Sequence, residues 1–401
     1  MTPPCLDRIR VLDLTRVLAG PFCTALLADL GAEVIKIETP EGDDYRHVPP
    51  FADGTGGLFL LLNRGKQSVA LDLRSEGGRQ IVRDLARTSD VLVENFRPGV
   101  MQAMGLAYAD LARDNPRLIQ VSISGFGQQS PLGDMPAYDL VVQALTGFMD
   151  LTGDPDGPPM MTGESVADLT TGLFASWATL AALLARERSG LGQHVDVAMF
   201  DSLFSFLPAA LAQYLYGTSA PRRVGNRHPL GAPFGVFRAA DGHYTIAVLN
   251  PRQFVRLAAA MGRPELASDP RFAANAARND NHAALKGLIE DWSTRHGVAD
   301  VVATLRRHDV PCSEILSVAE AARGAQVAAR GLLGGAGQTG GRSGAAMSQP
   351  AKFSGMQLAP SAPPPALGAD GRAVLARCLG LSGRDIDDLH DRGVLSLPSP
   401  A

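Results

Sequence analysis

The chain is poor in cysteine and in uncompensated charge, and these shortages exclude several classes of protein. Its four cysteines are scattered through 401 residues with no CxxC pair, so we expect no disulfide framework, no metal site and a reducing cytoplasm. The net charge is −4 without a long basic run, which argues against nucleic acid as a partner. No run of about 18 uninterrupted apolar residues is present, and charges interrupt the N-terminus, so we expect a soluble protein with no membrane partner.

Glycine and proline are plentiful, with 43 and 28 residues, and they separate segments of alternating type. Residues 9–15, IRVLDLT, have the pattern of a strand, Pro21 opens a helix, and residues 33–38, EVIKIE, form a second strand. The same alternation of strands and helices returns between residues 68 and 124, with helices expected near residues 76–87 and 99–113. This pattern predicts an α/β fold whose large domain is a Rossmann-like parallel sheet.

The texture changes in the second half of the chain, where a strand, the turn ADG and another strand precede several helices. We therefore expect a smaller α+β domain over residues 226–318. Residues 1–200 form the first part of the large domain, residues 201–225 a linker, and residues 319–401 a linker and a return to the large domain. The Gly-rich stretch 331–348 predicts a flexible loop.

The glycine pattern of a dinucleotide-binding loop is incomplete. The segment GFGQQS has Ser130 in place of the third glycine, and the first strand-to-helix loop, RVLAGP, has a single glycine. We therefore do not predict a pyridine-nucleotide site.

Asp168 stands between a Gly/Pro-rich loop and a long apolar helix. A carboxylate at this place acts either as the N-cap of the helix or as a nucleophile in the positive field of the helix start. We expect it to have an ordinary pKa of about 4, so that it is ionised at neutral pH without a general base.

Several segments together resemble family III CoA transferases, the CaiB/BaiF group, and span nearly the whole chain in the family's order. They are RVLDLTRVLAGPFCTALLADLGAEVIKIE, NRGKQSVALDL, VENFRPG, SGFGQ, AYDLVVQALTG, the Asp168 segment, SGLGQHVDVAMFDS and FSG. The resemblance implies an interlocked homodimer in which each chain passes through a hole in the other. It also implies that Asp168 is the aspartate that becomes covalently acylated.

The resemblance implies that the chain moves CoA from an acyl-CoA, with succinyl-CoA as the expected donor, to a small carboxylic acid, with a dicarboxylic acid as the expected acceptor. CoA and acyl-CoA are then substrates, and no tightly bound cofactor is expected. The alternative is an α-methylacyl-CoA racemase of the same family. A racemase carries a histidine where this chain has Tyr138, which disfavours that alternative. The transferases carry a Tyr followed by an acid at this position, so the resemblance places Tyr138 and Asp139 with Asp168 at the catalytic site. The alternatives are that Tyr138 packs in the core, and that Asp139 orients the site or caps the next helix.

The family contacts CoA through the first strand-to-helix loop and the strand ends that follow. In this chain these positions are Arg16, Val17, Ala19, Leu73, Asn95, Phe96 and Arg97. Lys66 and Arg46 are further cations that either meet phosphates or lie solvated on the surface. Thr39 occupies a position where some relatives place an arginine.

The acceptor acid is the least specified partner. The GNRHP…APF segment, in the basic cluster at 221–228, resembles members that act on dicarboxylates, and Arg227, Arg252 or Arg16 would bind the second carboxylate. Relatives that act on oxalate have a run of four glycines in the small domain, whereas this chain has Asn250 followed by Pro and Arg near that position. The departure argues against oxalate or formate.

Overall fold

The computed structural model describes residues 2–217, 220–335, 345–358 and 362–398. The chain divides into two compact units. Unit 1 comprises Met1–Phe148, Thr162–Ala209 and Ala325–Ala401, and unit 2 comprises Met149–Met161 and Ala210–Gly324. This division differs from the predicted one. Residues 149–161 belong to the second unit, unit 2 continues past residue 318 to Gly324, and the expected linker 201–225 is divided between the units after Ala209, within the helix α10 (Pro208–Tyr216).

Unit 1 is built on a seven-stranded sheet, in which each strand but the last in the chain runs parallel to its neighbours. From one edge to the other the strands are β14 (Leu395–Ser396), β5 (Lys66–Leu71), β2 (Glu33–Glu38), β1 (Arg10–Asp13), β6 (Val91–Glu94), β7 (Ile119–Ser124) and β8 (His194–Ala198). The six parallel strands have the order of a Rossmann fold, which reverses between β1 and β6. The predicted α/β fold with a large parallel sheet is confirmed.

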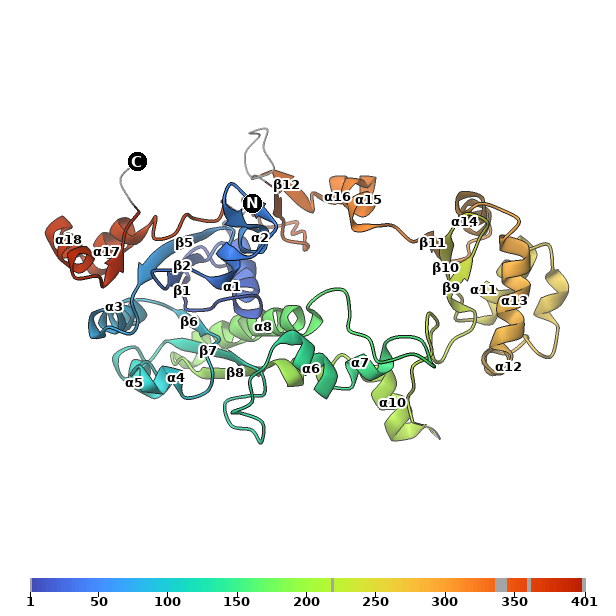
Figure 1. Ribbon diagram of the computed structural model, residues 1–401, viewed down its shortest axis with the longest axis horizontal. Coiled ribbons are helices and arrows are strands. Elements are labelled where there is room, and N and C mark those ends of the chain that lie inside the picture. Colours follow the sequence, from blue (N-terminus) through green and yellow to red (C-terminus); the bar gives the residue numbers. More distant parts are fainter. Residues whose placement is uncertain (1, 218–219, 336–344, 359–361, 399–401) are drawn as a thin grey trace. The chain divides into compact units, whose positions relative to one another are not determined.

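Helices cover both faces of this sheet because alternate residues of each strand are apolar on opposite sides. In β1, Leu12 packs under α3 (Glu76–Arg87), whereas Val11 packs under α1 (Ala19–Asp29) and α8 (Val166–Ser189). The first face also carries α4 (Val100–Ala103), α5 (Tyr108–Asp114), α17 (Gly371–Leu379) and α18 (Gly383–Asp391). Figure 1 shows α1 and α8 together on their side of the sheet.

Two local expectations in unit 1 are wrong. The single helix expected near residues 99–113 is broken into α4 and α5 at Gly105, which has a φ of +68°. The stretch expected to be a flexible loop contains β12 (Leu333–Gly335) and β13 (Ala345–Met347), which pair antiparallel, while residues 336–344 lie outside the described part of the chain.

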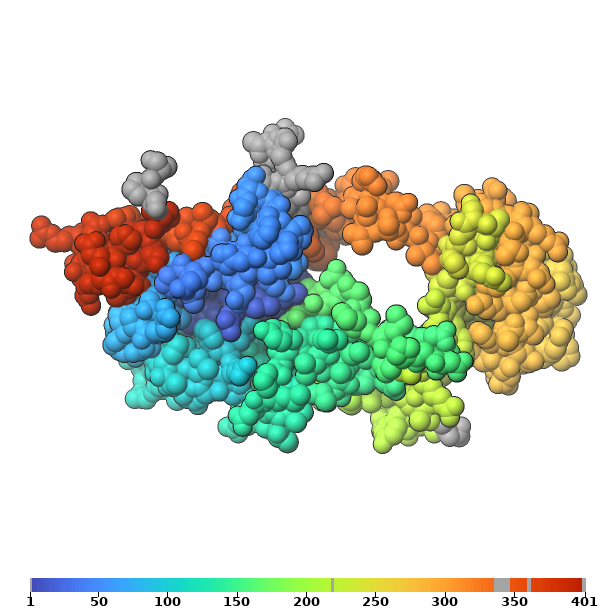
Figure 2. All heavy atoms as spheres, viewed as in Figure 1, coloured from blue at the N-terminus to red at the C-terminus, as the bar shows by residue number. Residues whose placement is uncertain are grey.

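Short elements complete unit 1. They are η1 (Asp44–His47), β3 (Phe51–Ala52), β4 (Thr55–Gly56), α2 (Gly57–Leu62), α6 (Asp139–Leu145), α9 (Met199–Phe204) and α16 (Ala325–Arg330). The C-terminal segment lies beside residues from the first part of the chain, as the red and blue atoms show in Figure 2. It does so because β14 pairs with β5 and α17 packs on the same sheet.

Unit 2 has its own small antiparallel sheet, β11 (Cys312–Glu314), β10 (His243–Ala247) and β9 (Phe234–Arg238) in that order. Its helical elements are α10, α11 (Pro251–Ala260), η2 (Pro264–Ala267), α12 (Asn275–Asp280), α13 (His282–Ser293), α14 (Val298–Arg307) and α15 (Val318–Arg323). The helix α7 (Phe148–Leu151) begins at the boundary of the two units. Tyr244, Phe254 and Phe272 are buried in a core that belongs to this unit alone.

Candidate active site

Asp168 is the third residue of α8, which begins at Val166, so the interpretation of Asp168 as the N-cap is wrong. The N-cap residue is Ser165, whose side chain makes no capping hydrogen bond. The Asp168 side chain is half-buried in the first turn, where the unpaired N–H groups of a helix favour negative charge. Among the described residues, α8 is the one helix that is long and apolar enough to span a membrane. Half of its most apolar window is buried inside the protein.

A neighbouring carboxylate supplies the cap that Ser165 does not. The Asp139 Oδ1 atom accepts the main-chain N–H of Ala167 at 2.7 Å, and its Oδ2 atom accepts the Gln143 Nε2 group at 2.5 Å. Gln143 in turn accepts the N–H of Thr162 at 3.1 Å. The helix α6 thereby holds both the loop before Asp168 and the first turn of α8. Asp139 does not cap α6, whose N-cap residue is Tyr138, but accepts a hydrogen bond from the first turn of α8.

The start of α1 lies directly against Asp168. A Cβ atom built on Gly172, one turn after Asp168, would lie 2.5 Å from the carbonyl oxygen of Ala19. Only glycine therefore permits the approach of α8 to the first turn of α1. This approach brings the main-chain N–H of Ala19 close enough to the Asp168 carboxylate to lower its pKa.

The ionisation of Asp168 differs from the sequence expectation. Burial raises the pKa of its carboxyl to about 7, and the negative charge of Asp139 adds to the rise, while the hydrogen bond from Ala19 opposes it. The expected ordinary pKa is therefore wrong. A carboxyl that titrates near neutrality beside fixed main-chain donors is typical of a functional site.

The loop between β1 and α1 is held at three consecutive residues. Lys36 Nζ donates to the Thr15 carbonyl at 2.7 Å and pairs with Asp43 at 2.9 Å; the Asp43 carboxylate also accepts the N–H of Val17 at 3.3 Å. Asn95, at the end of β6, accepts the N–H of Arg16 at 3.0 Å and donates to its carbonyl at 2.8 Å.

Val17 has a φ of 69°, a conformation that a β-branched residue adopts only under constraint. The contacts at Thr15, Arg16 and Val17 supply that constraint. Since Asn95 joins the loops after β1 and β6, the constrained loop lies at the position where the strand order reverses, the place where α/β proteins bind their ligands.

The remaining residues expected to contact CoA lie at the same edge, because they follow the carboxyl ends of parallel strands. Phe96 follows β6, and its N–H is accepted by the buried Glu94 carboxylate at 2.8 Å. Arg97 is exposed, and Leu73, after β5, packs partly on the core under α3. Burial raises the pKa of Glu94 to about 7.

Two cations expected to meet phosphates, or else solvent, are instead buried in ion pairs. Lys66 donates to Asp13 at 2.9 Å and to Asn63 at 2.8 Å, with its side chain inaccessible to solvent. Arg46 binds Glu38 through two hydrogen bonds of 2.7 and 2.6 Å. Both expectations are wrong because each cation pairs with a buried carboxylate at the end of a strand, Asp13 of β1 or Glu38 of β2.

Two tyrosines lie near the candidate site. Tyr138 is 72% exposed, so the alternative that it packs in the core is wrong. Tyr45 was not predicted from the sequence. Burial raises the pKa of the Tyr45 phenol, and the charge of Asp168 is the next cause, so this hydroxyl lies within electrostatic reach of the carboxylate. No motif marks Tyr45, since it lies in a short turn after Asp43.

The two arginines expected to bind substrate lie in unit 2. Arg227 lines a cavity of about 270 Å³, whereas Arg252, the second residue of α11, is exposed and does not line it.

Thr39 in unit 1, where some relatives place an arginine, makes a local hydrogen bond. Its hydroxyl donates to the Gly42 carbonyl at 3.3 Å. Among the described residues, no group of three or more His, Cys, Asp or Glu is placed to hold a metal ion, and Cys5, Cys23, Cys312 and Cys378 are free.

The Rossmann-ordered sheet and the carboxylate at its ligand-binding edge define an α/β enzyme. The model of CoA-transferase family III matches residues 6–371, and the chain belongs to this family and is a CoA-transferase. It is similar to the acetyl-CoA:oxalate CoA-transferase of Acetobacter aceti, with 47% identity over 82% of this chain and 85% of that protein. It is 41% identical to the succinate–glutarate CoA-transferase of Agrobacterium fabrum over 82% and 84% of the two chains.

Among solved structures, a CAIB/BAIF family protein from Brucella suis matches with a TM-score of 0.84 and 39% identity. The match covers 94% of this chain and all of that chain.

Proposed function

We propose that this enzyme transfers CoA from succinyl-CoA to a small dicarboxylic acid through a covalent intermediate on Asp168. The observation that carries the proposal is the close packing of the first turns of α1 and α8, which places the Ala19 N–H beside the Asp168 carboxylate. This arrangement provides a nucleophile and, in the same place, a fixed donor for negative charge on oxygen.

The reaction exchanges one thioester for another, so it needs neither ATP nor a metal. The ionised Asp168 attacks the thioester carbonyl, which forms a mixed anhydride and releases the CoA thiolate. The thiolate then attacks the aspartyl carbonyl, which gives an enzyme thioester and free succinate. The acceptor carboxylate attacks this thioester, and the same steps in reverse yield the new acyl-CoA and the free carboxylate of Asp168. The N–H of Ala19 stabilises the oxyanion that forms on the aspartyl group.

For CoA, we propose the constrained loop of Arg16, Val17 and Ala19, the neighbouring segment of Asn95, Phe96 and Arg97, and Leu73. The hydrogen bonds between Asn95 and Arg16 support this assignment because they fix two of these segments in one geometry. In this assignment Asn95 acts through the loop that it holds, and Arg97 is an exposed cation available to a phosphate.

For the acceptor acid, we propose Arg227, because the GNRHP…APF segment that contains it resembles that of members that act on dicarboxylates. Arg252 is the second candidate. The relative most similar of those named above acts on oxalate by its name, so oxalate remains among the acids to be tested despite the missing glycine run. A second carboxylate needs a cation, and an Arg227→Ala variant should raise KM for dicarboxylates far more than for monocarboxylates.

We propose that the enzyme is a cytoplasmic homodimer. The helix α8 supports this with Leu173, Trp177 and Leu184, which share one face and are 52%, 64% and 61% exposed. Apolar side chains gathered on one helix face favour burial by another chain. Light scattering coupled to size exclusion tests the dimer, and a monomer at micromolar concentration would contradict it.

Mass spectrometry of the intact protein after mixing with succinyl-CoA tests the mechanism. With hydroxylamine or borohydride as the trap, we expect an adduct that maps to Asp168 and is absent from the Asp168→Ala variant. No adduct with several acyl-CoAs, together with deuterium exchange at the α-carbon in heavy water, would instead favour a racemase.

A further inference from the structure

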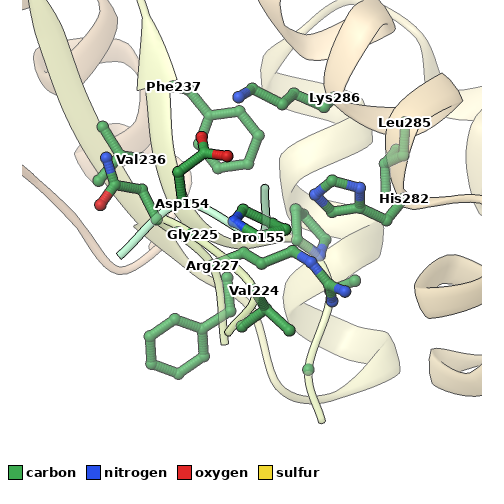
Figure 3. Close-up of a pocket in the computed structure, with 16 residues that line it drawn as sticks. Asp154, Pro155, Val224, Gly225, Arg227, Val236, Phe237, His282, Leu285 and Lys286 are labelled. Atoms are coloured by element: carbon green, nitrogen blue, oxygen red, sulfur yellow. The ribbon is translucent and has the colours of Figure 1, made fainter. Parts of the chain in front are cut away.

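Unit 2 contains a cavity of about 270 Å³ whose walls all belong to this unit (Figure 3). One wall is the segment of Arg227 and the adjoining strand β9, another is the first turn of α13, and a third is the loop at Asp154. The floor is partly apolar, with Phe237 and Leu285 both buried. The volume is suited to a small acid and is too small for a whole CoA molecule.

Helix geometry and close backbone packing hold two of these walls in place. His282, Leu285 and Lys286 fall on one face of α13 because they are three and four residues apart. The Arg227 segment bridges to Gly235 in β9, where a Cβ atom would lie 2.3 Å from the Asn226 carbonyl oxygen. The cationic side chains therefore project from packed elements.

The third wall is tied down by one arginine. Arg223 donates to the carbonyl and carboxylate of Asp150, each at 2.9 Å, and to the carbonyl oxygens of Asp154 and Gly157 at 3.3 and 3.2 Å. Within the basic cluster, Arg223 is thus structural, whereas Arg227 faces the cavity.

The cavity has more positive than negative charge. Arg227 makes no ion pair with any carboxylate in the described part of the chain, and Lys286 lies 3.8 Å from Glu290, which already binds Arg238 at 3.0 Å. Asp154 is the acid among the lining residues. Burial lowers the pKa of His282, and the positive charges of Arg227 and Lys286 lower it further.

We propose that this cavity binds a small dicarboxylate, with Arg227 on one carboxylate and Lys286 and His282 on the other. Two cationic groups at the cavity wall match the two charges of such an acid, and Phe237 and Leu285 accept its methylene groups. The proposal deepens the proposed function and rests on it for the choice of a dicarboxylate. It adds Lys286 and His282 to the acceptor site and leaves Arg252 outside it. For transfer, the carboxylate on Lys286 and His282 must leave these side chains to attack the thioester on Asp168, while Arg227 retains the other carboxylate.

Calorimetry with glutarate and the full chain, without acyl-CoA, tests the proposal. We expect wild-type protein to bind glutarate at least tenfold more tightly than butyrate, which lacks the second carboxylate. Arg227→Gln and Lys286→Met should each weaken glutarate binding at least tenfold, and Lys286→Arg should restore most of it. Arg295→Gln removes an exposed positive charge of the same unit and should leave binding unchanged.

Equal binding by the wild-type protein and the Arg227 and Lys286 variants, with circular dichroism showing all of them folded, would overturn the proposal. Binding of inorganic phosphate or 3′,5′-ADP, with no binding of glutarate, would also overturn it, because the cavity would then be a phosphate site. The proposed function fails separately. A chain that forms the Asp168 adduct but binds no glutarate refutes the cavity alone, and one that binds glutarate through Arg227 without an adduct refutes the mechanism alone.

Discussion

The Asp139 carboxylate accepts the main-chain N–H of Ala167 at 2.7 Å, one residue before the candidate nucleophile. The same carboxylate raises the pKa of Asp168 by its charge. One side chain thus orients the helix start and adjusts the ionisation of the group that it presents, and these two effects can be separated by substitution.

Asp139→Asn should shift the acidic limb of the pH–activity profile to lower pH. The substitution removes a negative charge beside Asp168 but keeps one oxygen to accept the Ala167 N–H. Asp139→Ala should cause a similar shift and additionally destabilise the fold by about 1–2 kcal/mol through the lost cap. Acylation rates from pH 5 to 9 measure the electrostatic effect of Asp139, and urea unfolding measures its effect on stability. An acidic limb that does not move in either variant would contradict the electrostatic role.

As the pH rises, the titration of Asp168 should increase the acylation rate but decrease the stability of the protein. Because burial raises its folded pKa to about 7, the rate of acylation by succinyl-CoA should rise with pH and level off above that value. Stability should change the other way. Between the unfolded pKa of about 4 and the folded pKa, the folded chain binds more protons than the unfolded chain, so the free energy of unfolding falls as the pH rises.

Asp168→Asn should abolish acylation and stabilise the protein above pH 7 by roughly 1–3 kcal/mol, with the gain vanishing near pH 4. Denaturant unfolding of both proteins at pH 5 and pH 8 measures it. A gain that is equal at the two pH values would show that Asp168 has an ordinary pKa in the folded chain.

Asn95→Ala should raise KM for acyl-CoA about tenfold, because the Arg16 main chain loses both of its partners. The lost hydrogen bonds should cost about 1–2 kcal/mol of stability. Gln102→Ala, at an exposed position on α4, is the control and should change neither quantity. Steady-state kinetics with succinyl-CoA decide the matter, and an unchanged KM would mean that the loop does not contact CoA.

Gly172→Ala should reduce acylation at least tenfold, because the added Cβ atom pushes α8 away from Ala19 and lengthens the hydrogen bond to Asp168. The crowding should destabilise the protein by about 1–3 kcal/mol. Gly383→Ala is matched, since a Cβ atom there meets nothing within 4 Å. Full activity of the Gly172 variant would refute the role of the close helix approach.

Periodicity and turn residues were sufficient to predict β1, β2, β5, β6 and β7 of the large sheet, since these runs are rich in β-branched residues and alternate with helical segments. The short edge strand β14 was not predicted. Asp168 was also identified, but only with its neighbouring motifs. Its raised pKa could not be predicted, because it arises from burial and from Asp139, which is 29 positions earlier in the chain. Lys66 and Arg46 were misassigned for the same reason. The sequence around a charged residue does not show which buried carboxylate it pairs with in the folded chain.

The cavity of unit 2 also escaped prediction, although Arg227 did not. Its walls combine a loop around Asp154 with segments some 70 to 130 residues later. Spacing along the chain indicates which residues share a helix face, as for His282 and Lys286, but not which loop packs opposite that face.

The pairing of β14 with β5 affects the order in which the chain completes its fold during synthesis. All residues of unit 2 have been made once Gly324 is added, whereas unit 1 lacks the strand that covers the edge of β5 until residues 395–396 emerge. Until then the N–H and C=O groups of β5 are open to pairing with another nascent chain. Loss of the last strand should therefore increase aggregation during expression more than it alters the folded catalytic edge.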